Sequence, residues 1–286
     1  MTQQKRAIAP MSMRYKAREK VTLEECKGMY ELFSQYYHNT PFDTFLSDLA
    51  KKKGVFIAKR HTDQKVVGFS TATTFDVDVD GRPVRLLFSG DTVMHKDYWG
   101  HPAFRKAFFM WLVRERLKNP LIEMHWFLIS MGYRTYLILA NNFYDYYPNI
   151  DGDDPHLKNV AIAASDYLFP NALNHDTMLL EFGDEACKLQ EFVTPISASE
   201  RQVPKIAFFE SRNPNWMHGS EMPCVGSLDH KSILKVFGDA RKTLLNKGKR
   251  RLNQQASSNP NATGTPILEP SALKQVGKRL KKTLVA

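Results

Sequence analysis

"FSGDTVMHKDYWGHPAFRKAFF", residues 88–109, joins a strand pattern to a helix pattern through a glycine and a loop. Gly90 interrupts the strand, and a glycine inside a strand marks a β-bulge or the close approach of another backbone or a ligand. Pro102 suits the first position of a helix, because the first N–H groups of a helix have no intrahelical partner. Those free N–H groups, with the cationic Arg105 beside them, favour an anion. The stretch therefore predicts a kinked strand that leads to an anion-binding helix start, with a plain bulge as the alternative.

The flanking segments alternate between helical and strand periodicity. A capping box of Thr22 and Glu25 opens one helix, and a second begins near Pro41. Three antiparallel strands are predicted next, over 54–60, 65–79 and 82–94. Farther along, helices are predicted over 102–117, 133–143, 157–169 and 230–246, and strands over 124–130, 204–210 and 223–228. This order predicts an α+β domain in which helices flank a mixed, mostly antiparallel central sheet.

Charge is distributed unevenly along the 286 residues. Residues 1–20 carry a net charge of +5 and residues 248–286 carry +7, which leaves −2 for residues 21–247. The sequence therefore predicts a basic N-terminal arm, one folded domain over 21–247 and a basic, disordered tail. Because the folded body is not basic, nucleic acid is not an expected partner.

Cysteine usage and hydropathy limit the location and the metal chemistry. The three cysteines, Cys26, Cys187 and Cys224, are far apart and odd in number, so they indicate neither a disulfide framework nor a zinc site. Residues 145–156 are rich in aspartate but lack the twelfth-position glutamate of a calcium loop. No metal site is predicted. No apolar run reaches the roughly 18 residues that span a bilayer, so the chain is expected to have no transmembrane segment and to be cytoplasmic.

The order of elements over residues 22–150 resembles that of the GNAT superfamily of acyl-CoA-dependent N-acyltransferases. In that family a bulged strand hydrogen-bonds the pantetheine arm of acyl-CoA, and the amides of the following loop hold its pyrophosphate. The resemblance implies an acyltransferase that takes acyl-CoA or acyl-phosphopantetheine as co-substrate, with no permanently bound cofactor. It places the donor against Phe88, Ser89, Gly90, Thr92 and Val93 of the strand and Gly100, His101, Ala103, Phe104 and Arg105 of the loop and helix.

The loop departs from the family pattern at two positions. Asp97 stands where Arg or Gln is expected, and Pro102 has no N–H for a phosphate. One interpretation is that the remaining amides hold the pyrophosphate. The other is that the acyl group arrives on a carrier protein, so that only a phosphopantetheine arm has to be held.

Direct attack by an amine or hydroxyl acceptor needs a base for the acceptor and an acid for the leaving thiolate. Asp91 on the bulged strand is the predicted base, and His125 and Tyr144 are the other candidate catalytic residues. Tyr146 and Tyr147 follow Tyr144 closely, and the sequence does not separate the three tyrosines. The segment 211–224 is predicted to be a loop between two strands and a candidate acceptor-binding loop, with Glu221 among its polar residues. The competing interpretation is a non-catalytic GNAT-like module that binds a lipid, a carrier protein or a partner chain.

Overall fold

The computed structural model describes residues 9–38, 41–183, 188–189, 196–229 and 231–232. The basic tail predicted at 248–286 lies outside these residues, as does the helix predicted at 230–246 apart from 231–232. Among the described residues, no helix is long and apolar enough to cross a membrane.

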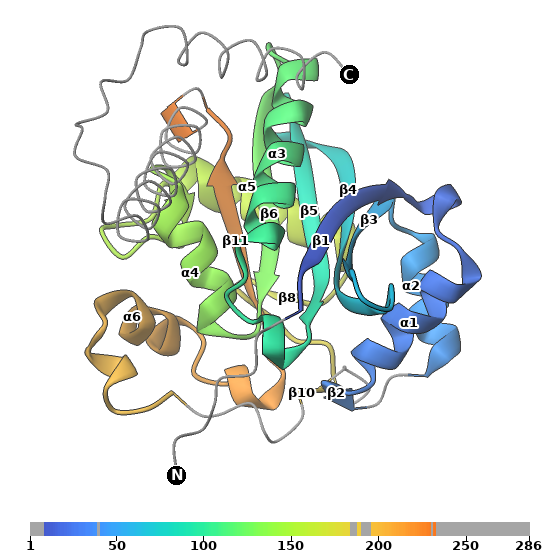
Figure 1. The fold of residues 1–286 in the computed structure, drawn as a ribbon. Helices are drawn as coiled ribbons and strands as arrows, with labels where there is room; N and C mark the ends of the chain where they lie inside the picture. Colours follow the sequence, from blue (N-terminus) through green and yellow to red (C-terminus); the bar gives the residue numbers. More distant parts are fainter. Residues whose placement is uncertain (1–8, 39–40, 184–187, 190–195, 230, 233–286) are drawn as a thin grey trace, which may run out of the picture. The chain divides into compact units, whose positions relative to one another are not determined.

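Seven strands form one sheet in the order β1-β3-β4-β5-β6-β11-β7 (Figure 1). Neighbouring strands run antiparallel except β5 and β6, which are parallel. Two small antiparallel pairs, β2 with β10 and β8 with β9, lie outside this sheet. The strands of the large sheet are β1 (Met11–Ala17), β3 (Gly54–Arg60), β4 (Val66–Val79), β5 (Arg82–Met94), β6 (Glu123–Ser130), β7 (Tyr146–Tyr147) and β11 (Met222–Ser227), and the short ones are β2 (Tyr37–His38), β8 (Leu173–Asn174), β9 (Leu179–Leu180) and β10 (Lys188–Leu189).

The helices named within the described ranges are α1 (Leu23–Phe33), α2 (Phe42–Ala50), α3 (Pro102–Lys118), α4 (Tyr133–Asn142), α5 (Pro155–Leu168) and α6 (Pro204–Arg212). Their starts follow from local chemistry. The predicted capping box is present, since the Thr22 hydroxyl accepts from the Glu25 amide and the Glu25 carboxylate accepts from the Thr22 amide. Asp154 caps α5 in a similar way, and Pro155 takes the first helical position.

The core lies in layers on both faces of the sheet. Apolar residues of α3, α4 and α6 pack on one face, where they meet Leu87 and Leu128. Those of α5 pack on the other, against Leu86 and Phe127, so α3 and α5 lie on opposite sides of the sheet (Figure 1). Apolar residues of α1 and α2 pack around Phe69 of β4, and those of α5 pack around Phe75 of the same strand. These two phenylalanines are six residues apart, so strand alternation puts them on one face, and α1 and α2 lie on the same side of the sheet as α5. The fold is thus the expected α+β arrangement.

Two predicted segments differ from the structure. Residues 11–17, assigned to a basic arm, form β1 and pair along their whole length with β3. Met11 and Met13 pack against the core from one face of this strand, and the basic Arg14 and Lys16 alternate with them on the other face. Residues 204–210, predicted as a strand, form α6. Ile206 and Phe209 are spaced to face the core from one side of a helix, and a short apolar run does not distinguish the two structures.

Candidate functional site

A β-bulge interrupts β5 directly after Gly90. Thr71 pairs with Gly90 and Phe69 pairs with Val93, so the single Ser70 faces two residues of β5. The first of these two, Asp91, has a φ of 44°. Gly90 itself is required by packing, since a Cβ there would lie 2.8 Å from the ring of Phe88.

The parallel strands β5 and β6 separate at the same level. Their pairing runs from Val84 opposite Glu123 to Ser89 opposite Leu128 and ends there. β5 continues to Met94, held on its other side by β4, and β6 continues to Ser130, held by β11. The edge of β5 that faces β6 therefore carries backbone groups outside any described ladder beyond Ser89. Such groups can bind an extended ligand as an added strand does.

The side chain of Asp91 is held at this separation by two polar groups. The Thr71 hydroxyl donates a hydrogen bond of 2.8 Å to its carboxylate. The Lys52 ammonium lies 3.8 Å from the same carboxylate oxygen and 5.0 Å from the centroid of the Phe88 ring. Asp91 therefore has a fixed carboxylate on the face of the sheet that α1, α2 and α5 cover.

Glu221 approaches the same place from the strand on the far side of β6. It lies directly before β11 and opposite the C-terminal end of β6, and two backbone hydrogen bonds to Leu180 fix its position. Glu221 and Val225 are four residues apart, so strand alternation places their side chains on the same face of the sheet. Val225 packs on the α5 face, and the Glu221 carboxylate therefore lies on the same face as Asp91. Burial, and then the negative charge of Asp91, raise the pKa of Glu221 to about 8.

Glu221 lies in a partly buried environment. Its side chain keeps partial exposure to solvent, and the hydrogen bonds among the described residues include none to its carboxylate. A carboxyl group whose pKa lies near neutrality can both accept and return a proton at physiological pH. No sequence signal pointed to Lys52 as a site residue. Glu221 was expected only as part of a loop, and the order of strands in the sheet brings Glu221 toward Asp91.

The predicted phosphate loop offers few free amides. The His101 amide donates to the Tyr98 carbonyl at 3.0 Å, and the His101 ring accepts from the Ala103 amide at 3.2 Å as the N-cap of α3. Pro102 has no N–H. Among residues 100–104, the amides of Gly100 and Phe104 are therefore the ones to which no described hydrogen bond is assigned, and these two could bind a phosphate. A pyrophosphate that needed more amides would have to displace the His101 ring from the Ala103 amide.

The side chains expected along the donor strand are mostly committed to the core. Phe88 and Val93 are buried, and the Ser89 hydroxyl accepts from the Trp126 indole at 2.9 Å. Thr92 is exposed and shares a hydrogen bond of 2.8 Å with Ser70. For most of these residues, a ligand could therefore contact the backbone but not the side chain. Arg105 is exposed on the first turn of α3.

His125 and Tyr144 lie at the opposite end of β6 from Asp91. His125 pairs with Leu86, five residues before Asp91, which corresponds to roughly 16 Å at about 3.3 Å per residue. Tyr144 adjoins Asp145, whose carbonyl accepts from the amide of Ser227, the residue opposite His125. The three candidate catalytic residues therefore do not form one site, and Glu221 is the group that the fold brings toward Asp91.

No protein-family model matches the sequence, and the comparison with curated proteins found no match. Solved structures do match in part. They include an Enterococcus faecalis V583 protein of unknown function described as a probable N-acyltransferase (16% identity, 46% of this chain and 31% of that chain, TM-score 0.37). A second is a GNAT family N-acetyltransferase from Escherichia coli in complex with CoA (12% identity, 46% of this chain and 68% of that chain, TM-score 0.32). A third is Saccharomyces cerevisiae N-myristoyltransferase with bound myristoyl-CoA (15% identity, 42% of this chain and 31% of that chain, TM-score 0.32). The match spans about a third of the first and last of these chains.

The fold itself can be stated from the elements already described. Two helices precede three antiparallel strands, a bulged strand leads through a loop into α3, and a single parallel pair separates beyond the bulge. The described part of this chain therefore has the mixed α+β fold, with a mostly antiparallel central sheet, that was expected from the order of elements.

Proposed function

We propose that the chain transfers an acyl group from an acyl thioester to an amine or hydroxyl acceptor where β5 and β6 separate. The observation that carries this proposal is the pair of carboxylates at that point. Asp91 stands on the bulge of β5, and Glu221, whose pKa is raised to about 8, stands on the same face beyond β6. Unpaired backbone beside titratable groups matches what direct acyl transfer requires.

In this proposal the arm of the thioester extends along β5 beyond Ser89 and pairs with backbone groups on the edge that no strand among the described residues occupies. The acceptor amine loses a proton to the Glu221 carboxylate and attacks the carbonyl carbon, so that a C–N bond forms. The C–S bond then breaks, and the leaving thiolate takes the proton back from Glu221. The Asp91 carboxylate accepts a hydrogen bond from the Thr71 hydroxyl, and its negative charge contributes to the raised pKa of Glu221.

Two donors remain in the proposal, and the helix start of α3 bears on the choice. Acyl-CoA brings a pyrophosphate, whereas an acyl carrier protein presents only a phosphopantetheine arm. Because His101 caps the Ala103 amide and Pro102 offers none, the loop favours the donor that demands fewer amides. The same closed cap supports the second candidate function, a module that binds a lipid, a carrier protein or a partner chain where β5 and β6 separate, without transfer.

The experiment combines acyl donors with simple acceptors and uses the full chain. Acetyl-CoA, a long-chain acyl-CoA and an acylated carrier protein are each incubated with a polyamine, lysine and a short peptide, and acylated product is measured by mass spectrometry. Product that depends on Glu221 supports the proposal, with Glu221→Gln as the test variant. Glu181→Gln is the matched control, because Glu181 is an exposed neighbour just after β9. Thermal stabilisation by a donor without any product would favour the binding module.

A further inference from the structure

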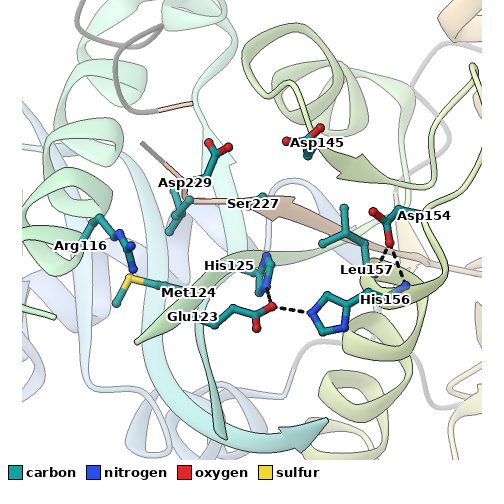
Figure 2. A pocket seen from close by; sticks show the side chains of 11 residues that line it. Arg116, Glu123, Met124, His125, Asp145, Asp154, His156, Leu157, Ser227 and Asp229 are labelled. Atoms are coloured by element: carbon teal, nitrogen blue, oxygen red, sulfur yellow. Dashed lines mark hydrogen bonds and ion pairs between the residues drawn. The ribbon is translucent and has the colours of Figure 1, made fainter. Parts of the chain in front are cut away.

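Three side chains that could bind a metal ion converge at the end of β6 away from the proposed acyl site. Glu123 and His125 are two residues apart on β6 and share one face of the strand. His156 comes from the first turn of α5. The Glu123 carboxylate lies between the two imidazoles, 2.7 Å from Nε2 of His125 and 2.5 Å from Nε2 of His156 (Figure 2).

These side chains are positioned by groups that the acyl-transfer proposal does not use. The Asp154 carboxylate accepts from the His156 amide at 2.8 Å and thereby fixes the start of α5. Asp80, in the turn between β4 and β5, places a carboxylate oxygen 4.0 Å from Nδ1 of His156. A carboxylate behind a histidine on the side away from the metal is a common outer-shell arrangement, because it orients the imidazole.

His125 supplies a second, independent observation. Its side chain is almost fully buried, 4% exposed, and its Nδ1 atom has no hydrogen-bond partner among the described residues. The one side-chain hydrogen bond described for this buried imidazole goes to a carboxylate that it shares with His156, so part of its hydrogen-bonding capacity is unused. A cation between the three groups would bind the Nε2 lone pair of the neutral imidazole, whose proton would then be on Nδ1.

The cluster opens into a pocket of about 310 Å³ whose wall carries further acids. Asp145, Asp154 and Asp229 line it, and Figure 2 shows Asp145 and Asp229 on the side of the pocket opposite Glu123. Arg116 is the arginine that the described residues place on the wall, and the hydrogen bonds described for it go to the backbone carbonyls of residues 119, 120 and 122. The pocket therefore attracts cations and has room for water on a bound ion.

We propose that Glu123, His125 and His156 bind a divalent transition metal ion, with Zn²⁺ as the best fit, and that its remaining coordination positions face the pocket. Two imidazoles and one carboxylate with an open position are a donor set that Zn²⁺ accepts. Ligand atoms about 2.0–2.1 Å from a tetrahedral ion are about 3.3 Å apart, so the two present contacts need to lengthen by less than about 1 Å. His156 and Glu123 are 42% and 37% exposed and can make that adjustment.

The site is independent of the acyl-transfer proposal, because it lies at the opposite end of β6. The metal-free alternative is a hydrogen-bonded triad in which the Glu123 carboxylate only orients the two imidazoles. In that state the hydrogen bond from His125, together with that from His156, lowers the pKa of Glu123 to about 2. A protonated histidine and a metal ion compete for the same lone pairs, so the two states can be distinguished by direct titration.

The test is a titration of the full chain, freed of any histidine tag and treated with a chelator, with Zn²⁺ followed by isothermal calorimetry. We expect one ion per chain, and binding at least about 100-fold weaker in His156→Ala and in Glu123→Gln, since even outer-shell changes cost up to that factor. His175→Ala is the matched control, because His175 is an exposed histidine beside a single carboxylate, 3.6 Å from Asp166. The control is expected to bind as the unaltered chain does.

Co²⁺ then reports the ligands. The expected spectrum has the visible bands of a four-coordinate ion and no thiolate-to-metal charge transfer, and these bands disappear in His156→Ala. No Zn²⁺ binding by the unaltered chain, equal affinity in His156→Ala, or a thiolate charge-transfer band would each overturn the proposal, the last by moving the ion to a cysteine. None of these results affects the acylation assay, so the two proposals fail separately.

Discussion

Replacing Glu221 by glutamine should stabilise the chain while abolishing its proposed activity. The pKa of Glu221 rises from 4.5 to about 8 on folding, so the unfolded chain releases its proton at a pH where the folded chain still keeps it. The carboxyl group therefore costs no stability below pH 4.5. The cost grows as the pH rises and is complete above pH 8.

The magnitude follows from the size of the shift. At about 1.4 kcal/mol per pKa unit, the full change corresponds to about 5 kcal/mol, and partial solvent exposure of the side chain reduces the expected value to about 2–3 kcal/mol. Glutamine keeps the shape and removes the ionisation. We expect Glu221→Gln to match the unaltered chain at pH 5 and to be more stable by this amount at pH 9.

The assay is urea unfolding at a series of pH values, with Glu181→Gln as the control that removes an exposed carboxylate close to Glu221 in the fold. The control should follow the unaltered chain at every pH. A Glu221→Gln variant whose stability tracks the unaltered chain from pH 5 to pH 9 would refute the reasoning, because Glu221 would then titrate as it does in water. Acylation by this variant at the unaltered rate would remove Glu221 from the mechanism.

Three further variants test neighbouring parts of the site. Asp91→Asn removes the charge that adds to the pKa of Glu221, so the acid limb of the pH–rate profile should move to lower pH; an unmoved limb would show that the two carboxyl groups do not interact. Gly90→Ala places a Cβ about 2.8 Å from the ring of Phe88 and should cost about 1–3 kcal/mol in urea unfolding, whereas an unchanged midpoint would mean that the ring moves freely. His101→Ala removes the helix cap at a cost of about 1 kcal/mol and frees an amide, so CoA should bind more tightly by calorimetry; weaker binding would instead make the imidazole a ligand contact.

Local sequence signals predicted most of the fold. The capping box at Thr22 and the proline at position 102 each act within a few residues, and the helices that they open begin where expected. The errors arose where a short segment had no local determinant. Residues 11–17 and 204–212 contain apolar side chains whose state depends on what they pack against.

The candidate site was harder to predict because it depends on the order of strands. Asp91 could be selected from the strand that contains the glycine, but Glu221 follows it by 130 positions in the chain and comes near only because β11 inserts beside β6. The histidines at 125 and 156 likewise meet through the packing of α5 on the sheet. No spacing in the sequence encodes either meeting, so the metal site was not predicted.

Hydrogen–deuterium exchange of the full chain with and without a non-hydrolysable acyl-thioester analogue, a ketone in place of the thioester, tests the role of the separated strands most directly. The account predicts slower exchange in residues 90–94 of β5 and residues 129–134 after the last β5–β6 pair, since a bound arm would take up their free backbone groups. Protection confined to other segments, or unchanged exchange at saturating analogue, would contradict it.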